Sequence, residues 1–129
     1  MRKYSRQRES IKNYLFSHHT HPTAETVYND LKKELPNISL GTVYRNLNLL
    51  ADTGEILRIS SGIGPDHYDG NTSLHYHFIC TKCRQILDLD LEALPEINRI
   101  AEESFRGRIT NHVIHFFGQC PKCSNIKNY

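Results

Sequence analysis

Two Cys-x-x-Cys pairs place the strongest constraint on how this chain can fold. The first pair is Cys80 and Cys83, the second is Cys120 and Cys123, and the chain has 4 cysteines in all. Two thiolates with this spacing can face one cation, and two such pairs complete the tetrahedral four-sulfur site of structural zinc. The pattern therefore predicts one zinc ion joining two segments of the chain. A pair of disulfides and four unrelated buried thiols are the alternatives.

The expected cellular compartment favours zinc over disulfides. The sequence shows no secretory signal and no apolar run near the ~20 residues that a membrane span needs. We therefore expect a cytoplasmic protein without a membrane partner, and persistent disulfides are rare in the cytosol. At 129 residues the chain has room for one ordinary domain or two small ones, and a metal is a usual way to stabilise a small domain.

The first 70 residues carry the signals of three helices and a β-hairpin. Ser5, Thr23 and Ser39 are candidate N-caps, and Gly54 is placed to end the third helix. Extended runs at 56–59 and 67–69 flank a turn rich in glycine and proline. This order is the winged helix-turn-helix pattern, whose third helix reads DNA. The expected inward residues are Ile11, Tyr14 and Leu15, then Val27, Leu31 and Leu35, then Val43, Leu47 and Leu50.

The outward face of the third helix carries side chains suited to a major groove. Arg45 can fork onto guanine, Asn48 can pair with adenine, and Thr42 or Tyr44 can meet thymine methyls or phosphates. Arg6, one of several basic residues near the N-terminus, is expected to contact phosphate. The alternative is an ordinary polar helix face, but the three-helix context favours double-stranded DNA as a partner.

The second half of the chain has a different pattern, which begins after an expected linker or hinge at 69–73. Residues 74–80, 86–90 and 109–118 read as extended segments, and 94–105 read as a helix. The fold class is therefore predicted to be α+β. A winged helix at 1–70 is followed by a small α/β domain at 74–129 that holds the cysteines.

Histidine and aspartate residues predict a second metal site. His75 and His77 alternate along an expected strand and so point to the same side. Asp69 lies just upstream, Asp88 lies on the next extended segment, and His21 precedes the second helix. Nitrogen and oxygen ligands suit Fe(II), Mn(II) or Zn(II) at higher coordination number. We expect structural roles for His18, His19, His67 and His115, and the sequence does not decide the role of His112.

The chain resembles the ferric uptake regulator (Fur) family over nearly its full length. The resemblance is carried by residues 21–24, 42–47, 75–83 and 111–123. It implies a homodimeric, metal-dependent transcriptional repressor. It also implies that the N-terminal winged helix binds DNA, that the C-terminal α/β domain forms the dimer, and that a regulatory metal bridges the two.

Within that family the chain is most similar to the peroxide-responsive branch. The resemblance implies that His21, Asp69, His75, His77 and Asp88 bind the regulatory iron or manganese. Iron-sensing members typically have glutamates at positions 69 and 88. They also have a further metal site, two of whose ligand positions correspond to Leu74 and Tyr76 here. That site is therefore expected to be absent, although His112 matches one of its ligands. The segment before Tyr4 is also shorter than in many members.

The resemblance implies that iron-catalysed oxidation of a histidine ligand, His21 or His75, reports hydrogen peroxide. A family member that senses iron, manganese or zinc supply is the nearest alternative. We expect no enzyme activity. A metal-dependent hydrolase lacks a suitably placed glutamate base, and a Cys-x-x-Cys oxidoreductase would need free thiols in a thioredoxin-like setting.

Overall fold

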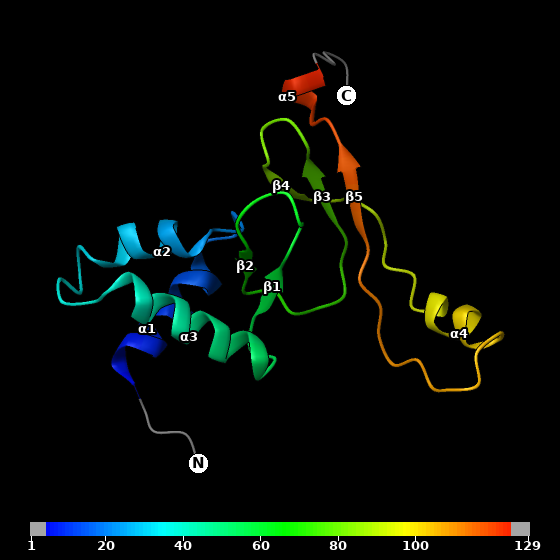
Figure 1. Cartoon of the computed structure of the whole chain (residues 1–129), viewed down its shortest axis with the longest axis horizontal. Coiled ribbons are helices and arrows are strands. Elements are labelled where there is room, and N and C mark those ends of the chain that lie inside the picture. Colours follow the sequence, from blue (N-terminus) through cyan, green and yellow to red (C-terminus); the bar gives the residue numbers. More distant parts are fainter. Residues whose placement is uncertain (1–4, 125–129) are drawn as a thin grey trace. The chain divides into compact units, whose positions relative to one another are not determined.

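The computed structural model describes residues 5–124 of the chain (Figure 1). By its internal contacts the chain divides into two compact units, Met1–Ser73 and Leu74–Tyr129. The first unit contains three helices and a hairpin, and the second contains a small sheet with two short helices. Within residues 5–124, no helix is both long and apolar enough to cross a membrane.

The three helices of the first unit begin at the predicted caps. They are α1 (Arg6–Ser17), α2 (Ala24–Leu31) and α3 (Leu40–Asp52). The hydroxyls of Ser5, Thr23 and Ser39 each accept a backbone N–H three residues later, at 3.2, 3.3 and 3.1 Å. These bonds satisfy N–H groups that have no partner inside the helix. The predicted helix starts are therefore confirmed.

The apolar faces of the helices meet in one core. Ile11, Val27, Val43, Leu47 and Leu50 are 0% exposed and belong to a single buried cluster. The second helix ends at Leu31, earlier than its apolar spacing predicted. Leu35 therefore lies beyond the helix, although it still packs against the core. The predicted inward residues thus all belong to this core or pack against it, and Ala24, Ile38, Ile56 and Tyr68 complete it.

A β-hairpin follows the third helix. Gly54 has φ of 79°, a left-handed conformation that favours glycine, and it follows the end of α3. Strands β1 (Leu57–Ile59) and β2 (His67–Asp69) then pair antiparallel, with Arg58 opposite Tyr68. Three helices followed by this hairpin form a winged helix-turn-helix, as predicted.

The second unit contains a three-stranded sheet in the order β4-β3-β5. Its elements are β3 (His77–Cys80), β4 (Ile86–Asp88), α4 (Glu96–Glu102), β5 (His115–Gly118) and α5 (Pro121–Ser124). Strands β3 and β4 run antiparallel, whereas β3 and β5 run parallel. With the first unit, this small α/β arrangement confirms the predicted α+β class.

All four predicted elements of the second unit are shorter than expected, and β4 ends at Asp88 and not at residue 90. Strand β3 begins at His77, so His75 lies before the strand. Strand β5 contains only the last four residues of the predicted run, because those four pair with β3. Helix α4 begins after Pro95, and the N–H of Leu94 is bonded to the hydroxyl of Tyr76 instead of joining the helix. Sequence periodicity gave no information about where strand partners or competing hydrogen bonds would limit these elements.

Candidate metal centres and nucleic-acid interface

The four cysteines converge at one edge of the sheet in the second unit. Cys80 ends β3, and Cys120 follows β5, whose Gly118 lies opposite Cys80. Because β3 and β5 are parallel, both Cys-x-x-Cys pairs come to the same edge, and the four sulfurs lie within 4.8 Å of one another. The sulfurs of Cys83 and Cys120 are 3.8 Å apart.

This spacing fits a tetrahedral zinc ion. Zinc–sulfur bonds of about 2.3 Å hold the sulfurs of a tetrahedral site about 3.8 Å apart, whereas a disulfide bond is about 2.05 Å long. The backbone N–H groups of Cys83 and Cys120 each reach the sulfur of Cys80 at 3.4 Å. They lower the pKa of Cys80 to about 5. The site therefore favours at least one thiolate, which is the form that binds a metal.

The remaining geometry of the cysteine cluster also favours a cation. A hydrogen bond between side chains, from Cys123 to Cys120, together with burial, raises the pKa of Cys123 to about 12. Several thiols packed together cannot all ionise without a compensating positive charge. Arg84, with φ of 64°, makes the left-handed turn after the first pair and donates its N–H to the carbonyl of Cys80 at 2.8 Å.

The first unit contains two of the five predicted regulatory ligands as a buried pair. His21 Nε2 lies 3.4 Å from Asp69 Oδ2, and both side chains are 5% exposed. The other carboxylate oxygen, Asp69 Oδ1, accepts the backbone N–H of Asn71 at 2.9 Å, which orients the carboxylate. His21 has φ of 54°, an uncommon conformation for a residue with a side chain, and such strain often accompanies a functional position.

The second unit holds the other three predicted ligands as a compact trio. Asp88 Oδ1 lies 3.3 Å from His75 Nε2 and 3.4 Å from His77 Nε2. The β3–β4 register places His77 directly opposite Asp88, and the two imidazole rings are 4.4 Å apart between centroids. Although His75 lies outside the strand, both imidazoles point to one carboxylate oxygen. The trio offers two nitrogens and one oxygen at a single point, a donor set suited to a divalent transition metal.

His112, which the sequence left undecided, is bonded to protein groups at both ring nitrogens. Its Nε2 lies 2.7 Å from the Tyr76 hydroxyl, and its Nδ1 lies 2.7 Å from Asn98 Oδ1. Leu94 donates its N–H to the oxygen of Tyr76 at 2.9 Å, so the Tyr76 proton is available for His112. These bonds form a chain from Tyr76, the residue before β3, through His112 to Asn98 of α4.

Two histidines that the sequence analysis assigned to structure lie beside the predicted ligands. His67 shares a face of β2 with Asp69, and its Nδ1 is buried with no hydrogen-bond partner among the described residues. His115 lies opposite His77 in the β3–β5 register, with ring centroids 5.9 Å apart. Burial lowers the pKa of both His67 and His115, which keeps both imidazoles neutral. The sequence contained no signal for the register that brings His115 to this place.

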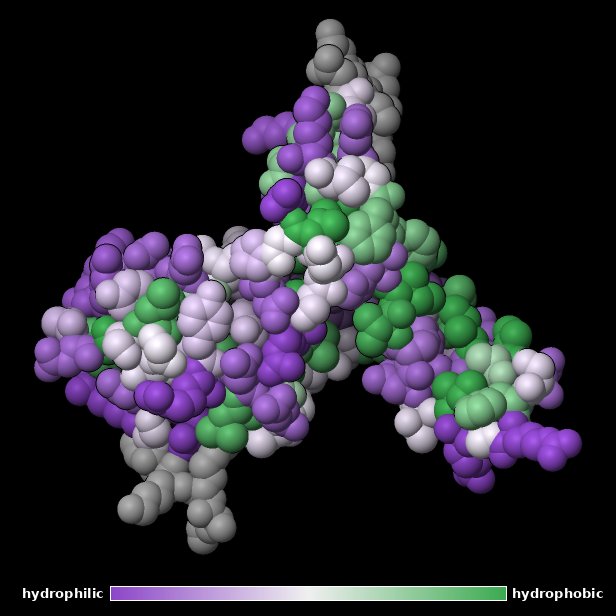
Figure 2. Space-filling view, viewed as in Figure 1, coloured by the Kyte–Doolittle hydropathy of each residue, from purple (hydrophilic) through white to green (hydrophobic). Residues whose placement is uncertain are grey.

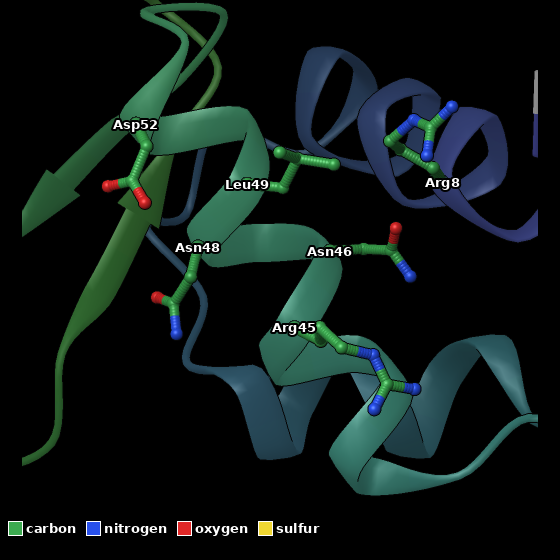
Figure 3. A pocket seen from close by; sticks show the side chains of 6 residues that line it. All are labelled: Arg8, Arg45, Asn46, Asn48, Leu49 and Asp52. Atoms are coloured by element: carbon green, nitrogen blue, oxygen red, sulfur yellow. The ribbon is translucent and has the colours of Figure 1, made fainter. Parts of the chain in front are cut away.

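The third helix presents two predicted DNA contacts to solvent. Tyr44 is 39% exposed, and Arg45 is also exposed. Beside them lies a hollow of about 510 Å³, lined by Arg8 of α1 and by Arg45, Asn46, Asn48, Leu49 and Asp52 of α3. Figure 3 shows these six side chains. Arg6 is exposed on α1. The hollow thus has two arginines in its wall.

The other two predicted contacts make hydrogen bonds within the unit. Thr42 Oγ1 lies 2.9 Å from the Ser39 hydroxyl and accepts a bond from Arg45 at 3.2 Å. Asn48 is exposed, but its Oδ1 receives bonds from Arg58 and Tyr68 of the hairpin. The bonds to Asn48 could not be predicted from the sequence, because they depend on how the hairpin returns to the helix.

Known proteins resemble this chain over most of its length. It is 39% identical over 119 residues to the peroxide-responsive repressor PerR of Staphylococcus aureus (strain USA300), which covers 92% of this chain and 80% of that relative. Its structure matches the Campylobacter jejuni peroxide stress regulator with a TM-score of 0.79 at 33% identity, covering 91% of this chain and 88% of that one.

The Helicobacter pylori ferric uptake regulator Fur, described as having three functional metal-binding sites, matches with a TM-score of 0.79 at 28% identity, over 95% of this chain and 82% of that one. The S. aureus relative is named as a repressor, a regulatory protein and not an enzyme. Residues 2–128 match the sequence profile of the ferric uptake regulator family. The chain therefore belongs to the ferric uptake regulator family.

Proposed function

We propose that this protein is a metal-dependent transcriptional repressor that binds operator DNA as a homodimer and senses hydrogen peroxide. The observation that carries the proposal is the arrangement of the predicted ligands as a buried His21–Asp69 pair in one unit and the trio of His75, His77 and Asp88 in the other. Neither group alone fills the coordination shell of Fe(II) or Mn(II), whereas three imidazoles and two carboxylates together suit either ion.

The division of the ligands between two units provides a regulatory device. When His21 and Asp69 share one metal with the trio, they hold the winged helix at a fixed angle to the second unit. In a two-fold dimer, that angle sets the distance between two recognition helices and therefore their fit to two DNA half-sites. Metal shifts the protein toward its DNA-binding arrangement to the extent that it binds that arrangement more tightly than the other arrangements of the two units.

The first domain, 1–70, reads DNA in this proposal. Tyr44 and Arg45 contact base edges, Thr42 and Asn48 lie beside them, and Arg6 contacts phosphate. The exposure of Tyr44 and Arg45 on α3 supports these roles. The second domain, 74–129, forms the dimer, and the zinc ion held by the four cysteines stabilises it. Exposed apolar side chains on and before the edge strand β5 support a second copy as the partner.

The sensing step is an oxidation of His21 or His75. Bound Fe(II) supplies the reduction of peroxide beside its own ligands. One peroxide oxygen is added to an imidazole carbon and the other leaves as water, so the two-electron change is balanced. The oxidised ring is a poorer ligand, so the metal is lost. Loss of the metal releases His21 and Asp69 from the trio, and the repressor then leaves the DNA. Mn(II) reacts poorly with peroxide, so the manganese-loaded form represses without sensing.

A sensor of metal supply is the second candidate. The structural match to the H. pylori ferric uptake regulator favours it, because that protein shares the fold at 28% identity. The two candidates differ in the response to peroxide and not in the response to metal.

The test uses a DNA duplex enriched from a random pool by the manganese-loaded protein. We expect binding with either Fe(II) or Mn(II), and release by dilute peroxide only in the Fe(II) form. Mass spectrometry should then find one added oxygen on the peptide bearing His21 or His75. We expect Asp88→Glu to keep metal-dependent DNA binding and to lose the peroxide response, because the longer arm changes the ligand geometry. An Fe(II) form that stays on DNA with unmodified histidines would establish a metal-supply sensor.

A further inference from the structure

Both strands of the hairpin bond to one side-chain oxygen of the recognition helix. Arg58 of β1 donates from Nη2 to Asn48 Oδ1 at 3.2 Å, and the hydroxyl of Tyr68 on β2 lies 3.3 Å from the same oxygen. Arg58 and Tyr68 are directly opposite each other in the hairpin. The same Nη2 also lies 3.2 Å from Asp52 Oδ1, one helical turn after Asn48. Figure 3 shows Asn48 and Asp52 projecting from the same side of α3.

The chemistry of the donors fixes how the Asn48 amide is turned. A guanidinium group has no acceptor, so the group that faces Arg58 must be the Asn48 oxygen and not its NH₂. Tyr68 is 1% exposed, and burial raises the pKa of its hydroxyl, which therefore keeps the proton that it donates. Two donors thus occupy Oδ1, and the Nδ2 group is left for other partners.

This arrangement conflicts with the role that the sequence predicted for Asn48. Paired recognition of adenine needs the amide oxygen to accept from N6 and the amide nitrogen to donate to N7 at the same time. In this structure the oxygen is already bonded to two donors from the hairpin. Arg58 is also paired with Asp52, whose side chain is 70% exposed. The positive charge of Arg58 is therefore offset by a carboxylate on the side of the helix that we propose to face DNA.

We propose that Asn48, with Asp52, Arg58 and Tyr68, forms a latch that fixes the hairpin against the recognition helix. We call these four residues the hairpin latch. Asn48 is then a positioning residue, and it offers DNA a hydrogen-bond donor only. This inference rests on the proposed DNA-binding function, and it deepens that function by assigning base reading to Tyr44 and Arg45 and hairpin placement to Asn48.

The first measurement needs no DNA. Backbone amide exchange of β1 and β2 is followed in the full chain loaded with zinc and Mn(II). Asn48→Ala and Arg58→Ala should each speed exchange in the hairpin while the core of α3 stays protected. Asn48→Asp should retain protection, because its carboxylate still accepts from both donors. Asn46→Ala is the matched control, because Asn46 donates to the carbonyl of Thr42 in its own helix and not to the hairpin. Unchanged hairpin exchange in Asn48→Ala and Arg58→Ala would overturn the latch.

The second measurement uses a duplex enriched from a random pool by the wild-type protein. Asn48→Ala and Arg58→Ala should each weaken binding by about tenfold, and the double variant should lose little more, because both changes remove one interaction. Tyr68→Phe should weaken wild-type binding about threefold and have no effect in the Asn48→Ala background.

Other outcomes assign these residues to direct contacts. Additive losses, or a salt dependence that falls by about one phosphate contact in Arg58→Ala, would make Arg58 a phosphate ligand and overturn the latch. If duplexes enriched by Asn48→Ala lose a fixed adenine, Asn48 is a base reader and the proposal is wrong. If the wild-type protein enriches no sequence, the proposed DNA-binding function fails, and amide exchange still decides whether the latch exists.

Discussion

The two units bury their apolar residues to very different extents. All twelve members of the buried core cluster belong to the winged helix. Of the large apolar side chains that are exposed within residues 5–124, Phe16 and Tyr44 belong to the first unit and the other eight to the second. Helix α4 buries no residue at all. In Figure 2 the surface over α4 is largely hydrophobic, whereas that of the helical unit is mainly hydrophilic.

The two units are therefore stabilised in different ways. The winged helix excludes water from a core of its own and needs nothing further to do so. The sheet of the second unit has strands of only four, three and four residues. Such a small sheet buries too little apolar surface to be stable alone. We therefore expect the second unit to depend on its zinc ion and on a second copy of the chain.

The largest expected effect is the loss of zinc. Cys83→Ser should unfold the second unit, because structural zinc contributes on the order of 10 kcal/mol to small domains. The first unit should keep its helices, since its core contains no cysteine. Circular dichroism, zinc content and sedimentation would measure these outcomes. Lys82→Ala, in the same turn, is the control, and a stable zinc-free dimer of Cys83→Ser would refute the dependence.

A substitution in the core of the winged helix should destabilise the first unit and leave the second unit unchanged. Leu47 is 0% exposed at the centre of the winged-helix core, and Leu47→Ala should cost about 2–5 kcal/mol of its stability. Zinc binding by the second unit should persist. Leu49→Ala, on the partly exposed side of the same helix, should cost much less. Thermal unfolding with zinc release as a second signal would show whether the two units unfold separately, and simultaneous loss of both signals would contradict the comparison.

A charged residue on the apolar surface of the second unit should weaken the dimer. Phe117 of β5 is 51% exposed, and Phe117→Asp should raise the dimer dissociation constant at least about tenfold, or by about 1.4 kcal/mol. Phe16→Asp in the first unit provides the match, because Phe16 is similarly exposed at 46%. It should leave the dimer intact. Sedimentation equilibrium measures both, and equal effects of the two substitutions would show that the exposed apolar residues of β5 have no special role.

At the helix that we propose to face DNA, the expected effect is on affinity alone, and stability should not change. Arg45→Ala should cost about 1–3 kcal/mol of affinity for an enriched duplex if Arg45 makes a bidentate base contact. Arg6→Ala should instead weaken all duplexes alike and reduce the salt dependence. Fluorescence anisotropy at several salt concentrations separates the two. Normal binding by Arg45→Ala with metal present would mean that another residue reads the groove.

The sequence predicted well wherever the cause is local. A serine or threonine cap bonds three residues along the chain, so Ser5, Thr23 and Ser39 were identified without knowledge of the fold. Apolar spacing likewise identified most of the winged-helix core. Strand lengths in the second unit were overestimated, because a strand ends where its partner ends and the partner lies far away in the sequence.

The same distinction applies to the candidate sites. The types of ligand could be identified from the sequence alone: four thiols with the spacing of zinc ligands, and a set of histidines and aspartates. Which of these side chains meet depends on the fold. Parallel pairing of β3 and β5 brings the cysteine pairs together, and the return of the hairpin brings Arg58 and Tyr68 to Asn48, ten and twenty residues earlier. Composition and spacing determine which chemistry is available, whereas contacts between distant residues depend on the packing of the whole unit.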